Sequence, residues 1–304
     1  MINENNTAIV LNEGHYATKY IQQRGFTVYR HLKSTNPLTR RLLNFCRNHS
    51  FLSRIERLFF DNTINNNNFD NYIVYDARAS VEYLKWLREN HPKARIILFY
   101  DNPVANTEVN VNQLNKKICE CWSFDYDDCK KYGLRYNSEF YFEELVCKER
   151  PIRHDIMFLG KDKGRYDRLV ELEKKFADLG LTMYLHIVPD SKLSANKKDR
   201  YRAGVSYPRL LEIVSESRVL LDILQDDQVG LTLRNMEAVF NGKKQITDNP
   251  AIRKYNFYST DNVFVLGEDD FSKLKEFVRT PSSGYDREIV NYYTFDEWIK
   301  RFDD

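Results

Sequence analysis

The chain has 304 residues and a formal net charge of +2; apolar residues make up 42% of it and charged residues 30%. This composition is typical of globular proteins and excludes a disordered or fibrous chain, and the length favours two domains. No apolar run approaches the roughly 20 residues that span a bilayer, and the N-terminus lacks the basic-then-apolar order of a secretory signal. We therefore expect a cytoplasmic protein.

Short β-branched or aromatic runs alternate with helix-period segments in the first half, a pattern typical of βαβ units and parallel sheets. The predicted strands cover residues 8–11, 26–30, 72–75, 95–100 and 121–124. Between the third and fourth strands, Val81, Leu84 and Leu87 present one face of a helix.

Basic residues are concentrated in the N-terminal half. From Arg24 to Arg57 there are eight Lys or Arg residues and one acid, Glu56, which indicates an anionic partner. Within residues 38–59, apolar side chains recur on one helical face and Arg40, Arg47, Arg54 and Arg57 on another. Two interpretations stay open: a segment that lies on an anionic membrane, or an ordinary domain helix with a solvated basic face.

Five cysteines occur without a C-x-x-C pair, which favours reduced thiols over a disulfide framework. Cys119, Cys121 and Cys129 are spaced closely enough to be considered as metal ligands. We favour the alternative that they are small apolar residues flanking a buried strand.

A polar segment with Pro151, residues 148–155, interrupts the pattern and predicts a linker. A second α/β series follows, with strands at residues 156–159, 183–188, 219–223, 245–247 and 263–266. We expect an N-terminal domain at 1–150 and a C-terminal domain at 151–304, and leave open whether the terminal helix crosses back. The predicted fold is α/β, with two Rossmann-like domains facing a central cleft and ligands at the carboxyl ends of the strands.

The most informative segment, residues 220–247, reads as strand, glycine-containing loop, helix and second strand. Gly230 allows close approach of the backbone to a ligand, and Thr232 begins a helix whose N–H groups and dipole favour a diphosphate. Arg234 supplies a bidentate phosphate donor, and Glu237 a carboxylate for ribose hydroxyls. The alternative is an ordinary turn followed by a surface ion pair.

The sequence Arg234-x-x-Glu237-Ala238, followed by Gly242 and an apolar strand, resembles the donor-site motif of GT-B glycosyltransferases. The longer pattern Gln228-x-Gly-Leu-Thr-x-Arg-x-x-Glu is similar to bacterial capsule and lipopolysaccharide glycosyltransferases. With weaker matches upstream, the resemblance covers roughly residues 95–265. It implies a nucleotide-diphosphate-sugar donor in the second domain and a glycan or lipid-linked acceptor facing the first.

The resemblance also implies roles for individual residues. Glu237 binds the ribose, Thr232 and Arg234 bind the diphosphate, the Gly160 turn forms a second phosphate loop, and the end of the strand at 183–188 holds the base. The implied donor-binding residues are Gly160, Lys163, Arg165, His186, Val188, Pro189, Tyr207, Gln228, Gly230, Leu231, Thr232, Arg234 and Glu237. Many members carry a second Glu eight residues before the ribose Glu, where this chain has Val229, and Gln228 is the candidate substitute.

An inverting transfer needs a general base, which in several GT-B families follows the first strand. The candidate here is His15, oriented by Asp76, with Glu13 as its rival; a solvated turn and a retaining mechanism remain alternatives. Asp125-Tyr-Asp127 is a D-x-D pattern that suits either a divalent metal or an acidic helix start. Because GT-B enzymes generally bind the diphosphate without metal, we expect no metal and no cofactor.

The resemblance therefore implies a metal-independent hexosyltransferase that acts in surface polysaccharide synthesis, in the cytoplasm or peripherally on the inner face of the membrane. No nucleic acid partner is expected. Two alternatives stay open: a non-catalytic, glycosyltransferase-like binding subunit, and a nucleotide-sugar epimerase of related fold.

Overall fold

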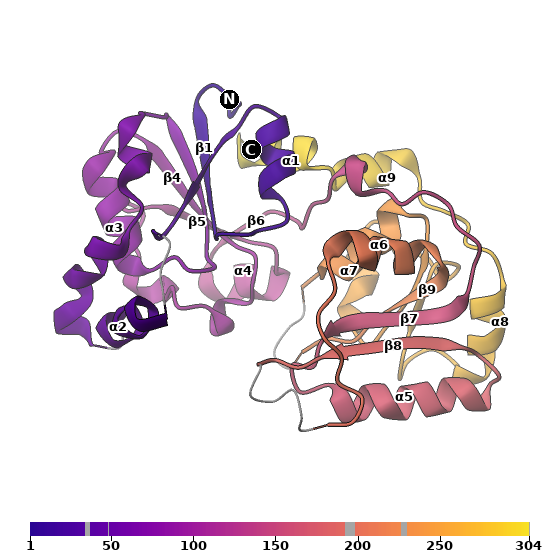
Figure 1. Cartoon of the computed structure of the whole chain (residues 1–304). Coiled ribbons are helices and arrows are strands. Elements are labelled where there is room, and N and C mark those ends of the chain that lie inside the picture. The colour runs from indigo at the N-terminus through magenta and orange to yellow at the C-terminus, as the bar shows by residue number, and fades with distance from the viewer. Residues whose placement is uncertain (34–36, 48, 192–197, 226–229, 304) are drawn as a thin grey trace. The chain divides into compact units, whose positions relative to one another are not determined.

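The computed structural model describes residues 1–33, 37–47, 49–191, 198–225 and 230–303 (Figure 1). The chain divides into two compact units: unit 1 comprises residues 1–138 and 299–304, and unit 2 comprises residues 139–298. Each unit is built on a parallel sheet, so the predicted α/β class is confirmed. The boundary that we expected after residue 150 falls inside unit 2, and the position of the domain boundary in solution stays a prediction.

Unit 1 contains a six-stranded sheet in the order β2-β1-β3-β4-β5-β6, with every neighbouring pair parallel. Its strands are β1 (Thr7–Leu11), β2 (Thr27–Arg30), β3 (Asn71–Tyr75), β4 (Arg95–Tyr100), β5 (Glu120–Ser123) and β6 (Arg135–Tyr136). Its helices are α1 (Thr18–Gln23), α2 (Pro37–Arg47), α3 (Val81–Asn90) and α4 (Tyr126–Tyr132), with 3-10 turns η1 (Ser50–Phe59), η2 (Asn62–Asn66), η3 (Val104–Asn106) and η4 (Val111–Gln113).

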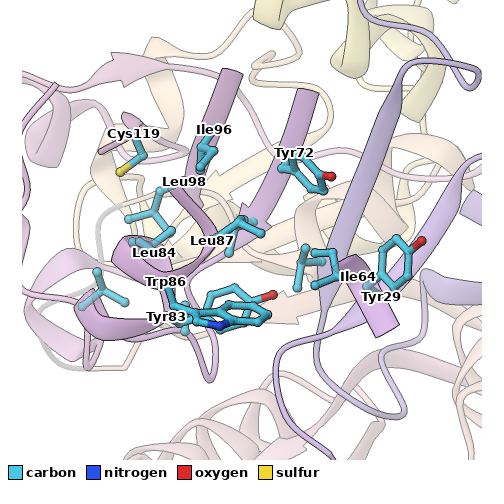
Figure 2. Packing of buried hydrophobic residues seen from close by; sticks show 14 of the residues in the cluster. Tyr29, Ile64, Tyr72, Tyr83, Leu84, Trp86, Leu87, Ile96, Leu98 and Cys119 are labelled. Carbon is cyan, nitrogen blue, oxygen red and sulfur yellow. The ribbon is translucent and has the colours of Figure 1, made fainter. Parts of the chain in front are cut away.

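Strands β1 and β3 of unit 1 are buried along their whole length, as expected for a parallel sheet covered on both faces. Helix α3 begins where the Ser80 side chain accepts the N–H of Tyr83 at 3.0 Å. Figure 2 shows Leu84 and Leu87 of this helix lying against Ile96 and Leu98 of β4, in the main core cluster of the unit.

The C-terminal segment contains α10 (Phe295–Lys300) and η9 (Arg301–Asp303). Its last residues pack within unit 1: the Phe302 ring lies 4.9 Å from that of Trp122 and 6.0 Å from that of Phe99. Arg95 donates to the Phe302 carbonyl at 2.6 Å. The face of the sheet opposite α3 is therefore closed in part by the end of the chain.

Unit 2 contains a five-stranded parallel sheet in the order β11-β10-β9-β7-β8. Its strands are β7 (His154–Lys161), β8 (Met183–Val188), β9 (Ser217–Asp222), β10 (Lys244–Thr247) and β11 (Val263–Val265). Its helices are α5 (Tyr166–Asp178), α6 (Tyr207–Ser215), α7 (Leu233–Phe240), α8 (Leu274–Arg279) and α9 (Arg287–Tyr292), with 3-10 turns η5 (Glu143–Leu145), η7 (Pro250–Lys254) and η8 (Phe271–Lys273).

Side chains of β7 alternate between two cores, because successive residues of a strand point to opposite faces. Ile156 and Phe158 belong to the cluster that also holds residues of α5 and α8. Met157 and Leu159 belong to the cluster with residues of α6 and α7. Helices therefore cover both faces of this sheet, and Figure 1 shows α6 and α7 on the side opposite α5.

The two sheets share one strand order. In each unit the strand that comes second in the sequence (β2 or β8) pairs with one side of the first strand. The strand that comes third (β3 or β9) pairs with the other side of that first strand. The direction of winding therefore reverses between β1 and β3 in unit 1 and between β7 and β9 in unit 2. Ligands of open α/β sheets bind outside the carboxyl ends of the strands at such switch points, so two places are marked for binding.

The segment at residues 38–59 is divided into two helical pieces near His49 and Ser50. It forms α2 and η1, in which Leu38, Leu42 and Phe45 are exposed. Arg47 and Arg57, by contrast, are held in ion pairs with acidic side chains: Arg47 with Glu56 and Glu108, and Arg57 with Glu82 and Glu89. Arg47 and Arg57 therefore do not form the solvated basic face of the ordinary-helix interpretation, and contact with a membrane stays a prediction. No helix in the described ranges is long and apolar enough to cross a membrane.

Candidate functional site

The turn after β7 lies at the switch point of unit 2. Lys163 and Gly164 both adopt positive φ, +46° and +81°. Asp162 caps the start of α5 by accepting the Tyr166 N–H at 2.7 Å, and Asp190, which follows β8, accepts the Lys163 N–H at 3.0 Å. Gly160, which we expected in this loop, lies within β7 and pairs with β8. The glycine of the turn is Gly164.

Arg165 clamps the carboxyl ends of two strands together. Its guanidinium donates to the carbonyl oxygens of Lys161 at 2.6 Å, Asp162 at 3.0 Å and Ile223. Three of its five N–H donors are therefore engaged in holding β7 against β9. The structure thus gives Arg165 a supporting position beside the phosphate loop that the resemblance implies.

The Lys163 ammonium has a different environment. It makes no hydrogen bond or ion pair within the part of the chain that the structure describes. Desolvation lowers its pKa, and the neighbouring cations of Arg165 and Lys161 lower it further, while Asp190 opposes them. A cation among other cations at the end of a strand is an environment in which an anionic ligand is favoured.

The expected base-binding residues His186, Val188 and Pro189 lie at the end of edge strand β8. His186 Nε2 lies 2.8 Å from the carbonyl oxygen of Ala203, and the ring borders a cavity of about 360 Å³ with Tyr184. In the β7–β8 pairing His186 lies opposite Leu159, whose carbonyl accepts from Arg234. The Val188 carbonyl accepts the Asp162 N–H at 2.8 Å, so the end of β8 lies beside the turn that carries Lys163.

The start of α7 is held by a buried polar network. Thr232 donates through Oγ1 to Asp222 at 3.0 Å and accepts the Arg234 N–H at 3.2 Å, while its own N–H donates to Asn235 at 2.7 Å. These N–H groups, which we expected to be open to a diphosphate, are therefore already bonded. Gly230 and Leu231 are buried beside them, and Gln228 lies outside the described residues.

Asp222, the last residue of β9, is the buried anchor of this network. It also accepts from Asn235 Nδ2 at 3.1 Å. Burial raises the pKa of Asp222 to about 6, with Asp248 adding to the rise and Thr232 and Arg234 opposing it. Sequence reasoning missed Asp222, Asp162 and Asp190. In the sequence, each of these residues is visible only as a single acid at or just after the end of an apolar strand.

Arg234 and Glu237 are brought together on α7. They form an ion pair, and Arg234 Nη2 also donates to the Leu159 carbonyl of β7 at 2.8 Å. Glu237 accepts a second hydrogen bond from the Tyr207 hydroxyl at 3.0 Å, and Tyr141 donates to that hydroxyl at 2.8 Å. Burial raises the Glu237 pKa, and Arg234 opposes the rise. The two oxygens of Glu237 are thus both engaged.

The candidate catalytic residues lie at the carboxyl end of β1 in unit 1. His15 Nδ1 accepts the Ala17 N–H at 3.2 Å, and burial lowers the His15 pKa to about 4. Asp76 accepts from the Asp101 N–H at 2.9 Å. No hydrogen bond joins His15 to Asp76 among the described residues. Glu13 is exposed and forms an ion pair with Arg30 at 3.2 Å.

The D-x-D pattern lies at the start of α4. Asp125 Oδ1 accepts the N–H groups of Asp127 at 2.8 Å and Asp128 at 3.3 Å, so Asp125 acts as the helix N-cap. Within the described ranges no three His, Cys, Asp or Glu side chains are grouped to hold a metal ion. Cys121 lies in β5 and Cys119 directly precedes that strand, and their sulfur atoms are 3.9 Å apart.

Two Rossmann-like units with parallel sheets, joined in one chain, define the GT-B fold of glycosyltransferases. No protein-family model matches the chain, and neither does any curated protein. Among solved structures, the lipopolysaccharide outer core galactosyltransferase WaaB in its apo form matches over 98% of both chains, with a TM-score of 0.57 and 13% identity.

Two further solved structures show the same fold. Sucrose-phosphate synthase from Thermosynechococcus elongatus matches over 98% of this chain and 97% of its own, with a TM-score of 0.61 and 10% identity. The Anabaena protein HepE, solved with UDP and glucose, matches over 97% and 94%, with a TM-score of 0.53 and 9% identity. At these identities the likeness establishes the fold, and the expected resemblance to GT-B glycosyltransferases is confirmed at that level.

Proposed function

We propose that the chain is a glycosyltransferase that takes a nucleoside-diphosphate-sugar at the β7–β9 switch point and an acceptor at the β1–β3 switch point. The observation that carries the proposal is the Lys163 ammonium, a cation without a hydrogen-bond or ion-pair partner in the described structure, at the end of β7. In a GT-B fold this is where a switch-point ligand binds, and a diphosphate supplies the missing anion.

In this proposal Lys163 contacts the diphosphate, and Arg165 keeps the strand ends in place around it. Glu237 accepts from the ribose. For that, the Tyr207 hydroxyl must leave the Glu237 carboxylate, so that a ribose hydroxyl donates in its place. Charge compensation by Lys163 is also why we propose a metal-independent transfer, with Asp125 retained as a helix cap.

For an inverting transfer we propose Glu13 as the general base in preference to His15. Because His15 Nδ1 accepts a backbone N–H, the neutral ring carries its proton on Nε2. That nitrogen donates and does not accept, and the lowered pKa makes the ring a weak base. Glu13 has an exposed carboxylate on the same loop, where an acceptor hydroxyl can reach it.

We further propose that the acceptor is a glycan or lipid-linked molecule of bacterial surface polysaccharide synthesis, met at the cytoplasmic face of a membrane. The support is an apolar patch on α2 and η1, formed by Leu38, Leu42, Phe45, Ile55 and Leu58, which are 40–73% exposed. Arg41 and Arg54 are exposed in the same segments. Apolar side chains flanked by cations are the arrangement that binds an anionic lipid surface.

A second candidate is a non-catalytic binding subunit of the same fold. It is favoured by one observation: the Glu237 side chain is 1% exposed, and both of its oxygens are already bonded. A subunit that never binds ribose would have no reason to open this network. The epimerase alternative would instead convert a nucleotide-sugar without any acceptor, so product analysis distinguishes it from transfer.

A thermal-shift screen of uridine, guanosine, adenosine and cytidine nucleotides and their sugars tests the proposal. A ligand that binds only the folded state at about 100 times its Kd adds roughly 2.7 kcal/mol of stability, which raises the unfolding midpoint. We expect one nucleoside diphosphate to do so, and Lys163→Ala to abolish the shift. Lys174→Ala, an exposed lysine of α5, is the matched control. A screen with no shift, or a shift unchanged in Lys163→Ala, would contradict the proposal.

A further inference from the structure

A second cavity lies at the switch point of unit 1, with a volume of about 90 Å³. The loops after β1, β2 and β3 line it, through Asn12 and Glu13, Arg30 and Lys33, and Arg78, and Leu43 of α2 closes one side. The cavity is smaller than the roughly 150 Å³ space that takes up a benzene molecule. It therefore suits a substituent rather than a whole sugar ring.

The charges around the cavity do not cancel. Arg30 is compensated by Glu13 at 3.2 Å and by Asp61 at 3.6 Å. Among the described residues Lys33 has one partner, the neutral Leu58 carbonyl at 3.1 Å. The exposed Arg78 guanidinium makes no hydrogen bond or ion pair in the described part of the chain. The three cations and two carboxylates thus leave a net positive charge, and Lys33 and Arg78 are the cations without a carboxylate partner in that part of the structure.

Arg78 is held in position by its backbone. Its φ is +70°, in the left-handed region that strains a non-glycine residue. Two contacts maintain this conformation: Arg47 Nη2 donates to the Arg78 carbonyl at 3.0 Å, and the Ala79 N–H donates to the Asp76 carbonyl at 2.9 Å. Arg47 is therefore a positioning residue, because it holds the backbone that carries the Arg78 guanidinium.

The cavity also contains an unsatisfied acceptor. Asn12 Oδ1 is buried and has no hydrogen-bond partner in the described structure. Leaving such a buried acceptor unpaired is unfavourable, so an O–H or N–H donor is expected from whatever fills the cavity. His31, which also lines the cavity, adds no charge, because burial lowers its pKa to about 4.

We propose that this cavity binds a phosphate ester on the acceptor, with Lys33 and Arg78 pairing its charge. The proposal rests on the proposed function, because it specifies the acceptor of that transfer. A phosphate monoester carries a charge of about −1.5 to −2 at neutral pH and has three strong acceptor oxygens, so one group can pair with both Lys33 and Arg78. A protonated phosphate oxygen or an adjacent hydroxyl supplies the donor for Asn12. The phosphate can belong to a soluble glycan or to a lipid. A lipid is a candidate because α2, which carries part of the apolar patch, also lines the cavity through Leu43.

Calorimetric titration of the full chain tests the proposal with three probes of related ring structure: glucose 6-phosphate, glucuronic acid and glucose. We expect glucose 6-phosphate to bind, and Arg78→Gln and Lys33→Gln each to weaken it about ten- to hundredfold, the effect of removing a charge-assisted hydrogen bond. Lys85→Gln, an exposed lysine of α3, should leave its binding unchanged. Co-sedimentation with vesicles of phosphatidic acid in phosphatidylcholine tests whether the phosphate belongs to a lipid. A lipid phosphate is indicated if Arg78→Gln lowers the amount of protein that sediments with these vesicles.

Three results would overturn the proposal. One is the absence of glucose 6-phosphate binding, and another is glucuronic acid binding as tightly as the phosphate. The third is binding that Lys163→Gln removes and Arg78→Gln does not, since the phosphate would then occupy the donor site. Loss of nucleotide binding in the thermal-shift screen, with phosphate binding intact, would refute the glycosyltransferase function and leave the cavity assignment standing.

Discussion

Arg234 and Glu237 form a buried ion pair three residues apart on α7, in which the glutamate side chain is 1% exposed and the arginine side chain 12%. The sequence allowed a surface ion pair at this spacing, and that alternative is wrong. Because Arg234 also bonds the Leu159 carbonyl, the pair joins α7 to β7. Its two members therefore support the fold as well as the proposed donor site.

Removing one member of this pair should destabilise the protein strongly. Arg234→Ala leaves a buried carboxylate without its cation, and such losses cost about 3–5 kcal/mol. We expect a corresponding fall in the free energy of unfolding, measured with urea. Glu237→Gln should cost less, since the amide still accepts from Tyr207.

The matched control is Arg209→Ala on α6. Arg209 forms an ion pair with Glu212 at the same spacing, but the two side chains are 50% and 38% exposed. Exposed pairs contribute less than about 1 kcal/mol. Equal losses in Arg209→Ala and Arg234→Ala would show that burial of the Arg234 pair does not determine its energy.

The choice of general base predicts different kinetics for two neighbouring residues. Glu13→Gln should lower kcat by about a hundredfold or more while nucleotide affinity stays unchanged, because only the proton acceptor is lost. His15→Gln should change kcat much less. A large loss in His15→Gln alone would return the base role to His15, and full activity in both variants would indicate a retaining route.

The apolar patch predicts binding to anionic vesicles. Leu42→Ser and Phe45→Ser combined should reduce co-sedimentation, and Arg41→Gln with Arg54→Gln should reduce its sensitivity to salt, since exposed charges are screened. Ile152→Ser, another exposed apolar residue, 40% exposed, is the control. If wild type does not sediment with anionic vesicles, the patch has a different partner.

Asp222 predicts a specific dependence of stability on pH. Its folded pKa, about 6, lies above the usual aspartate value of 3.8, so the folded state retains the proton to higher pH than the unfolded chain. Ionisation of the buried Asp222 therefore lowers the stability of the folded state. This loss of stability is absent below pH 4, grows as the pH rises to 6, and is constant above that. Asp222→Asn should remove it, so variant minus wild-type stability should increase by roughly 3 kcal/mol between pH 4 and 7.

Urea unfolding at several pH values measures this difference. Asp178→Asn, at the exposed end of α5, serves as the control for loss of a surface carboxylate. A difference between Asp222→Asn and wild type that does not change with pH would mean that Asp222 ionises as easily in the folded protein as in the unfolded chain.

The candidate site was predicted in part from its motif. The order of strand, loop and helix around Thr232 and Glu237 was visible in residues 220–247, because each element has its own local periodicity. The acids that organise the site were not, since a single Asp after a strand has no period. Whether Lys163, Arg234 and Glu237 bind a nucleotide-sugar stays a prediction, and the thermal-shift screen tests it.

Sequence alone determined the α/β class of this protein, because continuous apolar runs such as β1 and β3 are stable only in a parallel sheet covered on both faces. Tertiary structure alone decided the environment of each polar or apolar side chain. Phe45 is exposed, whereas the Arg47 side chain is only 10% exposed, because Arg47 pairs with Glu56 and with the distant Glu108. Burial depends on which distant residues meet in the fold, and no local pattern contains that information.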